Sequence, residues 1–457
     1  MLRSVSSYLE TILDRFIKNP LLQRVLRNAS YLFSAQTISA GLSFAQGVLA
    51  ARTLGIAGIG QLEAIVQFSS NINRLTSFRM GELVVSYVGE FTEEGRKEHA
   101  AAVYKLAALS ELGSSLLAFV IVVLLAPWGA RFLVHDPALA DLCIVYGFAI
   151  LANGITESST GLLQYFDRFK RLAAVTILQS VLTLALISYA YFVTGTLLHI
   201  VLAYLAGKVV WSLTISVAAL IEARNQWGRG WWMQPLATLK GRFRELFHFA
   251  FNTNITGTIT LVTRDSETLW LAGFTSPIQV GYYKIAKAIM NILVIPVNPL
   301  ISTTFREIAR EAARKQWENV RYLLRTGSTL AAMYTIPASA ALVFFGRFVI
   351  GLYGSDFLPV SYYALLILLI GICADNILYW NRTVLLPLGQ PSYPTLVHSI
   401  GAGLKIAGTI LLVPEFGAIG MAVLLSLFMT GTASILLVRT LRVLRGLEEA
   451  VPEPEGV

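Results

Sequence analysis

The chain has 457 residues, of which 55% are hydrophobic and only 14% are charged, and its mean hydropathy is +0.63. Soluble domains carry about 25% charged residues, so this composition excludes a soluble globular protein and predicts an all-α polytopic membrane protein. A net charge of +9 would point to nucleic acid in a soluble protein. Basic cytoplasmic loops account for it here, and we expect no nucleic-acid partner.

The expected elements begin with a surface segment and continue as apolar spans. Residues 1–29 carry apolar side chains every three or four positions among charged ones, which predicts an amphipathic cytoplasmic segment. A membrane-crossing helix needs about 20 mostly apolar residues. About twelve such helices are expected, at 30–51, 60–84, 105–127, 140–160, 173–194, 197–220, 247–272, 279–303, 326–346, 360–380, 394–413 and 416–438.

The connections between these spans alternate in charge. Basic residues concentrate in every second connection, as in Arg168, Lys170 and Arg171, and in the C-terminal tail. Cytoplasmic loops carry the excess of Lys and Arg, so both termini are expected in the cytoplasm. An even number of spans gives the same result. The protein is therefore expected to cross a membrane many times.

Short segments recur in the same order in the two halves of the chain. Gly58-Ile59-Gly60 opens the second span, and Gln279-Val280-Gly281 opens the eighth. Such self-similarity indicates an internal duplication. The predicted domains are therefore an N-lobe at 30–221 with six spans, a cytoplasmic linker at 222–246, a C-lobe at 247–438 with six spans and a cytoplasmic tail at 439–457. Transporters with repeated halves bind cargo at the interface between the repeats.

Charged side chains inside the spans are the strongest functional signal. An ionised side chain at that depth costs roughly 2.5–3.5 kcal/mol, so it usually faces a protein interior or a water-filled cavity. Arg264 and Asp265 lie in the seventh span, and Lys284 and Lys287 share one face of the eighth. An arginine can hold two phosphate oxygens at once, so this group predicts an anion-binding cavity.

Single charges in other spans extend the set. The predicted cavity cations are Arg264, Lys287, Lys284, Arg74, Lys208 and Lys405. The predicted ion-coupling residues, which would carry a proton or help to bind Na⁺, are Asp265, Asp375, Glu63 and Glu157. Packing is the alternative: Asp265 or Glu267 would neutralise a lysine in a closed interior, and Lys284 would extend to the outer interface. The scattered histidines and the two cysteines favour no metal site, and we expect no catalytic residue and no cofactor.

Three motifs carry a resemblance to polysaccharide transporters. The Leu-Ala-x-x-x-x-Gly-x-x-Gly-x-Gly pattern at 49–60 resembles their first loop, and the segment 280–287 resembles the opening of the second lobe of Wzx-type flippases. The turn at 385–391 resembles the corresponding turn of that family, with Gln390 where a basic residue is common. These flippases belong to the MOP superfamily, together with the lipid II flippase and the MATE exporters.

The resemblance implies a function. Members move an undecaprenyl-pyrophosphate-linked oligosaccharide from the inner to the outer leaflet by alternating access, for assembly of capsule, exopolysaccharide or the O-antigen of lipopolysaccharide. An H⁺ or Na⁺ gradient is the candidate driving force. The implied partners are this glycan, membrane lipids, and the polysaccharide polymerase and chain-length machinery. Three alternatives stay open: a lipid II flippase, a MATE-like ion-coupled exporter and, against the short outward loops, a membrane glycan polymerase.

Overall fold

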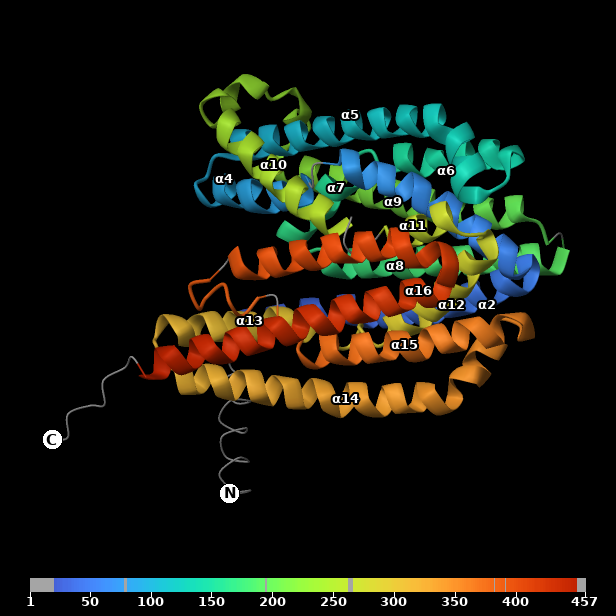
Figure 1. The fold of residues 1–457 in the computed structure, drawn as a ribbon. Coiled ribbons are helices and arrows are strands. Elements are labelled where there is room, and N and C mark those ends of the chain that lie inside the picture. The colour runs from blue at the N-terminus through green and yellow to red at the C-terminus, as the bar shows by residue number, and fades with distance from the viewer. Residues whose placement is uncertain are drawn as a thin grey trace.

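The computed structural model describes residues 20–77, 80–193, 195–261, 266–381, 383–390 and 392–449, which form a bundle of long helices (Figure 1). No β-strand occurs in these ranges. Eight of the described helices are long and apolar enough to cross a membrane. The prediction of an all-α polytopic membrane protein is therefore confirmed. The count of about twelve spans and the cytoplasmic position of the termini stay predictions, and residues 1–19 of the amphipathic segment lie outside the description.

The N-lobe comprises the helices from α2 to α9. They are α2 (Pro20–Thr76), α3 (Met80–Leu83), α4 (Gly89–Glu93), α5 (Lys97–Gly129), α6 (Ala140–Ala152), α7 (Thr156–Tyr165), α8 (Phe169–Val193) and α9 (Leu197–Trp227). Helix α2 contains the first expected span and most of the second. The two spans are separated by a kink at Gly55, whose φ is 66°. A residue with a side chain rarely adopts that left-handed conformation.

The C-lobe contains the broken helices. Its elements are α10 (Phe243–Thr260), α11 (Glu267–Phe274), α12 (Pro277–Ile292), α13 (Asn298–Ala313), α14 (Trp317–Gly351), α15 (Leu358–Ile377) and α16 (Ser392–Glu449). The expected span 279–303 is interrupted near Pro296, and α13 begins at Asn298, directly before Pro299. Proline lacks the backbone N–H that a helix interior requires, which explains this break. Helix α16 bends at Gly417, with a φ of 52°, and contains two expected spans.

The two lobes share one hydrophobic core at one end of the bundle and have separate cores at the other. Buried residues of α2, such as Ile59 and Leu62, form one cluster with Val280 and Tyr283 of α12. At the opposite end, one cluster lies wholly within α3 to α10 and another within α12 to α16 and the connections between them. The first of these two clusters includes Ala250 of α10, so the first helix of the C-lobe also packs against the N-lobe at that end.

Helices α2 and α12 cross closely at this shared core. A Cβ atom on Gly60 would overlap the carbonyl oxygen of Pro277, and one on Gly281 would overlap the carbonyl oxygen of Ile56. Gly60 and Gly281 occupy matching positions in the duplicated segments. The guanidinium of Arg52 also donates to the carbonyl of Leu352 at 2.8 Å, which adds a hydrogen bond between the lobes.

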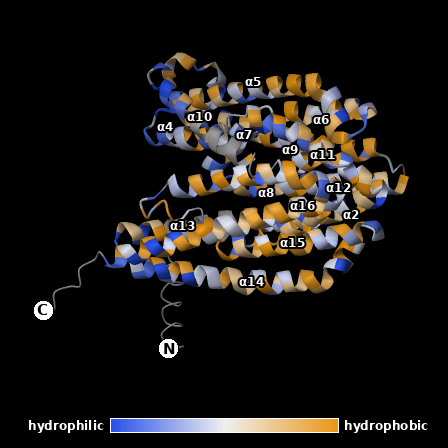
Figure 2. Ribbon diagram, viewed as in Figure 1, coloured by the Kyte–Doolittle hydropathy of each residue, from blue (hydrophilic) through white to orange (hydrophobic). Residues whose placement is uncertain are grey.

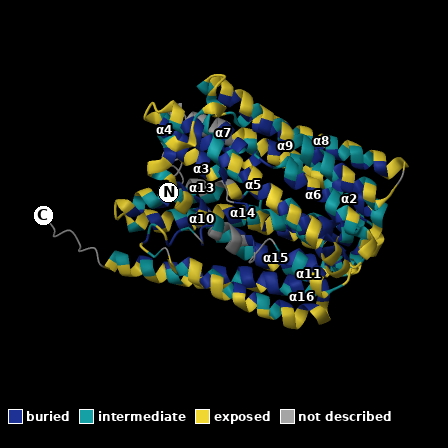
Figure 3. Cartoon of the chain, turned by 90° about the horizontal axis from the view of Figure 1, so that it is seen from above, coloured by how far each residue is buried: buried dark blue, intermediate teal, exposed yellow. Residues whose placement is uncertain are grey.

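The outer faces of the bundle suit a lipid environment. Large apolar side chains are exposed there, including Leu124 (73% exposed), Phe192 (81%) and Phe344 (80%). Figure 2 shows apolar residues along the long helices and hydrophilic residues gathered at the end with α4 and α13. Figure 3 shows buried residues toward the inside of the bundle and exposed residues on its outer surfaces.

The predicted linker packs against the N-lobe. Its first residues end α9, and Trp231 lies 5.3 Å from the ring of Tyr104 in α5, measured between centroids. Arg242 donates hydrogen bonds to Glu90 and Glu245, and the bond to Glu245 lowers the pKa of the Glu245 carboxyl. These contacts fix the beginning of α10 against α4.

We expect Gly60→Ala and Gly281→Ala each to lower the melting temperature of the detergent-purified protein, with a loss of about 1–3 kcal/mol in stability from overpacking. Gly113→Ala is the matched control, because nothing lies within 4 Å of a Cβ at that position of α5. Thermal unfolding of the three variants measures the difference. Equal melting temperatures for Gly60→Ala and Gly113→Ala would contradict a tight backbone contact between the lobes.

Candidate functional site

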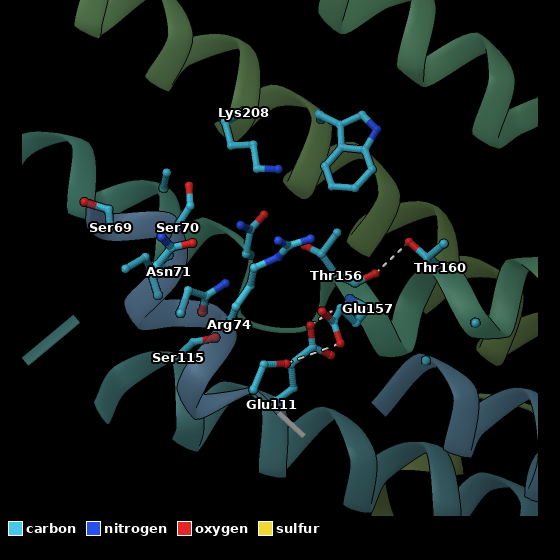
Figure 4. Close-up of a pocket in the computed structure, with 18 of the residues that line it drawn as sticks. Ser69, Ser70, Asn71, Arg74, Glu111, Ser115, Thr156, Glu157, Thr160 and Lys208 are labelled. Atoms are coloured by element: carbon cyan, nitrogen blue, oxygen red, sulfur yellow. Dashed lines mark hydrogen bonds between the residues drawn. The ribbon is translucent and has the colours of Figure 1, made fainter. Parts of the chain in front are cut away.

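The N-lobe encloses a cavity of about 630 Å³ (Figure 4). Residues of α2, α3, α5, α6, α7 and α9 line it. Tyr146 and Ile150 of its wall belong to the shared core, whereas Gly81 and Gly161 lie beside residues of the N-lobe's own core. The cavity therefore lies partway along the helices, and its volume is typical of a small-molecule site.

Two of the predicted cations meet in this cavity. Arg74 comes from the last turn of α2, and Lys208 comes from α9. Figure 4 shows both side chains pointing into the same space. The ammonium of Lys208 lies 4.9 Å from the centre of the Trp211 ring, within the range of a cation–π interaction. Arg74 and Lys208 thus provide positive charge at mid-depth of the N-lobe.

The same cavity contains carboxylates, so its charge is mixed. Glu82, Glu111 and Glu157 all contribute to the wall. Glu157, a predicted ion-coupling residue, accepts a hydrogen bond from the hydroxyl of Ser77 at 3.3 Å. A cavity with both signs of charge, several hydroxyl groups and several amides can bind a ligand that carries an anion next to neutral polar groups.

Glu111 stabilises the start of α7, one of the helices that line this cavity. The expected span 140–160 breaks between α6 and α7, which leaves backbone N–H groups of α7 without helical partners. The Glu111 carboxylate accepts from the N–H of Glu157 at 2.7 Å and from the N–H of Ser158 at 2.9 Å. It also accepts from the Ser158 hydroxyl at 2.7 Å. One buried carboxylate on α5 therefore satisfies a helix terminus inside the N-lobe.

Glu63 and Lys284 form an ion pair between the lobes. Glu63 is 6% exposed and belongs to α2, whereas Lys284 belongs to α12 and is partly exposed. The pair lies one turn beyond the contact of Gly60 with Pro277. The structure therefore places a predicted cavity cation and a predicted coupling acid at the junction of the two lobes.

Lys287 and Lys405 both bind the carboxylate of Glu267 in the C-lobe. Lys287 lies 2.8 Å from it, and Lys405 reaches its other oxygen from α16. The hydroxyl of Tyr283 donates to the same carboxylate at 2.8 Å. Glu267 is 1% exposed, so its one negative charge is shared by two lysines within the C-lobe interior. This arrangement matches the packing alternative that the sequence left open.

The remaining predicted residues lie elsewhere. Asp375, near the end of α15, accepts a hydrogen bond from the side-chain amide of Asn381 at 3.2 Å. Arg264 and Asp265 lie outside the described residues, so their roles stay predictions. Among the described candidates, the structure therefore places Arg74, Lys208 and Glu157 in one cavity, Glu63 and Lys284 at the lobe junction, and Lys287 and Lys405 around Glu267.

Sequence reasoning did not select two central carboxylates. Glu111 is a single acid in the expected span 105–127, and the rule that selected Arg264 would also have selected it. The sequence suggests Glu267 only as a neutralising partner of a lysine. In the structure it is the first residue of α11. The uncharged polar residues of the cavity carry no comparable signal, because Ser, Thr and Asn occur throughout membrane helices.

The fold and the charged interior define a class of protein: a multi-pass membrane transporter. The model of the family described as "Polysaccharide biosynthesis protein" matches residues 25–305, more than half of the chain. The chain belongs to this family. It is 28% identical to the probable flippase AglR of Haloferax volcanii over 179 residues, which are 38% of this chain and 37% of AglR. The chain thus matches well under half of that relative's length.

Solved structures show the same fold. An inward-facing MATE family transporter of the MOP superfamily superposes with a TM-score of 0.73 at 14% identity, over 91% of this chain and 96% of that one. The lipid II flippase MurJ, in an inward closed conformation, gives 0.70 at 15% identity over 92% and 90%. A MOP superfamily transporter from Pyrococcus furiosus gives 0.66 at 14% identity over 93% and 96%. The architecture is therefore that of the MOP superfamily.

We expect Glu267→Gln to lower the stability of the protein by about 3–5 kcal/mol, because it removes the carboxylate that pairs with the buried Lys405 and the partly exposed Lys287. Thermal unfolding in detergent measures the loss. The double variant Glu267→Gln/Lys405→Met should recover part of it, since one of the two uncompensated charges is removed. A double variant that is less stable than Glu267→Gln alone would argue against mutual compensation.

Proposed function

We propose that this protein is a flippase that moves an undecaprenyl-pyrophosphate-linked oligosaccharide across the bacterial cytoplasmic membrane. The transfer runs from the inner to the outer leaflet, for assembly of O-antigen, capsule or exopolysaccharide. Membership of the polysaccharide biosynthesis family supports the class of cargo. The single observation that carries the proposal is the N-lobe cavity with Arg74 and Lys208 among hydroxyl and amide groups.

The cavity chemistry fits the two polar parts of such a lipid. A pyrophosphate is an acceptor-rich anion, and an arginine beside a lysine offers both a two-pronged donor and a point charge. The hydroxyl and amide side chains of Ser70, Asn71 and Thr160 suit neutral sugars. The prenyl chain is apolar and stays in the lipid, which the exposed apolar faces of the bundle also contact.

The arrangement of the lobes supports alternating access. A shared core joins the lobes at one end, and at the other end α13 to α16 have a core of their own while α10 packs with the N-lobe, so α13 to α16 could move relative to the N-lobe there. Rocking about the crossing of α2 and α12 would separate Glu63 from Lys284 and open the joined end. In this scheme an H⁺ or Na⁺ gradient drives the change, with Glu157, Asp375, Glu63 and the undescribed Asp265 as the proposed coupling residues. Arg264 keeps its proposed role in binding the anion.

A MATE-like ion-coupled exporter is the second candidate. The observation that favours it is the set of carboxylates in the cavity, Glu82, Glu111 and Glu157, which would suit a cationic cargo. The hydrogen bonds of Glu111 to α7 already occupy one of these groups. A lipid II flippase would share the pyrophosphate chemistry and would differ in the glycan attached to the lipid that it moves.

We expect Arg74→Ala and Lys208→Met each to reduce surface glycan about ten-fold or more in a flippase-deficient strain, since a charge-assisted hydrogen bond is worth about 1.5–3 kcal/mol. Surface glycan is quantified together with the amount of protein in the membrane. Lys170→Met is the matched control, because Lys170 is exposed and lies outside the cavity. Glycan output at the wild-type level from both cavity variants would exclude the proposed anion site.

A further inference from the structure

Three deeply buried polar side chains in the wall of the N-lobe cavity have no hydrogen-bond partner among the described residues, namely Ser69, Asn71 and Thr156. Asn71 is only 5% exposed, and neither its Nδ2 nor its Oδ1 atom has a hydrogen-bond partner in the described part of the chain. Thr156 is 3% exposed, and its hydroxyl is equally unpaired within that part. Both residues line the cavity (Figure 4). Because buried polar groups are nearly always hydrogen-bonded, these groups require a partner inside the cavity, which is either water or a polar group of a ligand that displaces it.

The chemistry of Asn71 restricts what that ligand is. Its amide places a donor and an acceptor side by side. Ionised phosphate oxygens only accept, and a metal ion binds only the carbonyl oxygen, so either would satisfy half of the group. Neighbouring hydroxyl groups on a sugar ring can donate to Oδ1 and accept from Nδ2 at the same time. The hydroxyl of Thr156 also both donates and accepts.

The position of Asn71 identifies which sugar would be bound. Asn71 and Arg74 are three residues apart in α2, so they share one helix face and lie about one turn apart. One turn rises about 5.4 Å, which is comparable to the distance from a phosphate group to the sugar ring attached to it. A ligand held by Arg74 through its phosphate would therefore present that first ring to Asn71.

We infer that Asn71 and Thr156 bind hydroxyl groups of the sugar attached directly to the pyrophosphate, next to the anion held by Arg74 and Lys208. This inference rests on the proposed function and adds a site for the first sugar. The two pairs have separate tasks. The cations bind every prenyl pyrophosphate, whereas Asn71 and Thr156 favour those that carry a sugar.

Binding of short-chain lipids to the full-length protein in detergent tests this division. The probes are farnesyl pyrophosphate and farnesyl pyrophosphates bearing glucose, galactose or N-acetylglucosamine. We expect the wild-type protein to bind at least one glycosylated probe about ten-fold more tightly than farnesyl pyrophosphate. Asn71→Leu should abolish that preference and leave the Kd of farnesyl pyrophosphate unchanged. Thr156→Val should reduce the preference in the same direction.

A matched variant separates binding from structure. Asn376 in the C-lobe is also buried, at 3% exposed, but its amide donates to the carbonyl of Leu293 at 3.0 Å. Asn376→Leu should therefore lower the melting temperature of the protein and keep the preference for a glycosylated probe. Asn71→Leu loses no protein hydrogen bond, so its melting temperature without probe should equal or exceed that of the wild type.

Each other outcome overturns a specific statement. If Asn71→Leu keeps the preference, or destabilises the protein as Asn376→Leu does, Asn71 is not a sugar-binding residue and the flippase proposal stands. If the wild type binds all four probes equally, the first-sugar site is excluded and the anion site stands. If the wild type binds none of them, the proposed function fails, and the inference that rests on it fails too.

Discussion

The close crossing of α2 and α12 is the contact on which the arrangement of the two lobes depends. Backbone meets backbone there, because Gly60 packs on Pro277 and Gly281 packs on Ile56 without a side chain between them. Only this short separation brings Glu63 of one lobe within reach of Lys284 of the other. The apolar core around the crossing includes both lobes, whereas each opposite end has its own core. A rotation in which α10 stays with the N-lobe would therefore break polar contacts at the crossing and leave both of the other cores intact.

Buried charge has different tasks in the two lobes. In the C-lobe, Glu267 takes up two lysines and a tyrosine hydroxyl, so three helices are tied together and little polarity faces outward. In the N-lobe, Glu111 satisfies the start of α7 and thereby holds open a break in the helix. Residues on both sides of that break line the N-lobe cavity. A buried glutamate thus pairs with lysines in the C-lobe and caps a helix start beside the cavity in the N-lobe.

The sequence predicts the fold well because long apolar runs and basic connections follow directly from the membrane. It also names Arg74 and Lys208, which both line the N-lobe cavity, because a charge in an apolar run needs water or a partner. It does not predict that Lys287 and Lys405, over 100 residues apart, meet at one carboxylate, because such a contact depends on how α11, α12 and α16 pack. Asn71 and Thr156 leave no trace in the sequence at all. Their importance appears only once burial and missing hydrogen bonds are known.

The contrast between Asn376 and Asn71 shows why the cavity is unlike the rest of the interior. Asn376 donates to Leu293, so its burial is compensated and it contributes to stability. Asn71 is buried to a similar degree without such compensation among the described residues. A protein selected for stability alone would place an apolar residue at that position, since an unpaired buried amide is unfavourable. A ligand with both donors and acceptors reverses the balance, because its hydrogen bonds then form where the protein offers none of its own. The hydrogen bonds that Asn71 does not make with the described residues would therefore contribute to the free energy of cargo binding. A transporter with such a site can favour its cargo without stabilising one closed state of its own.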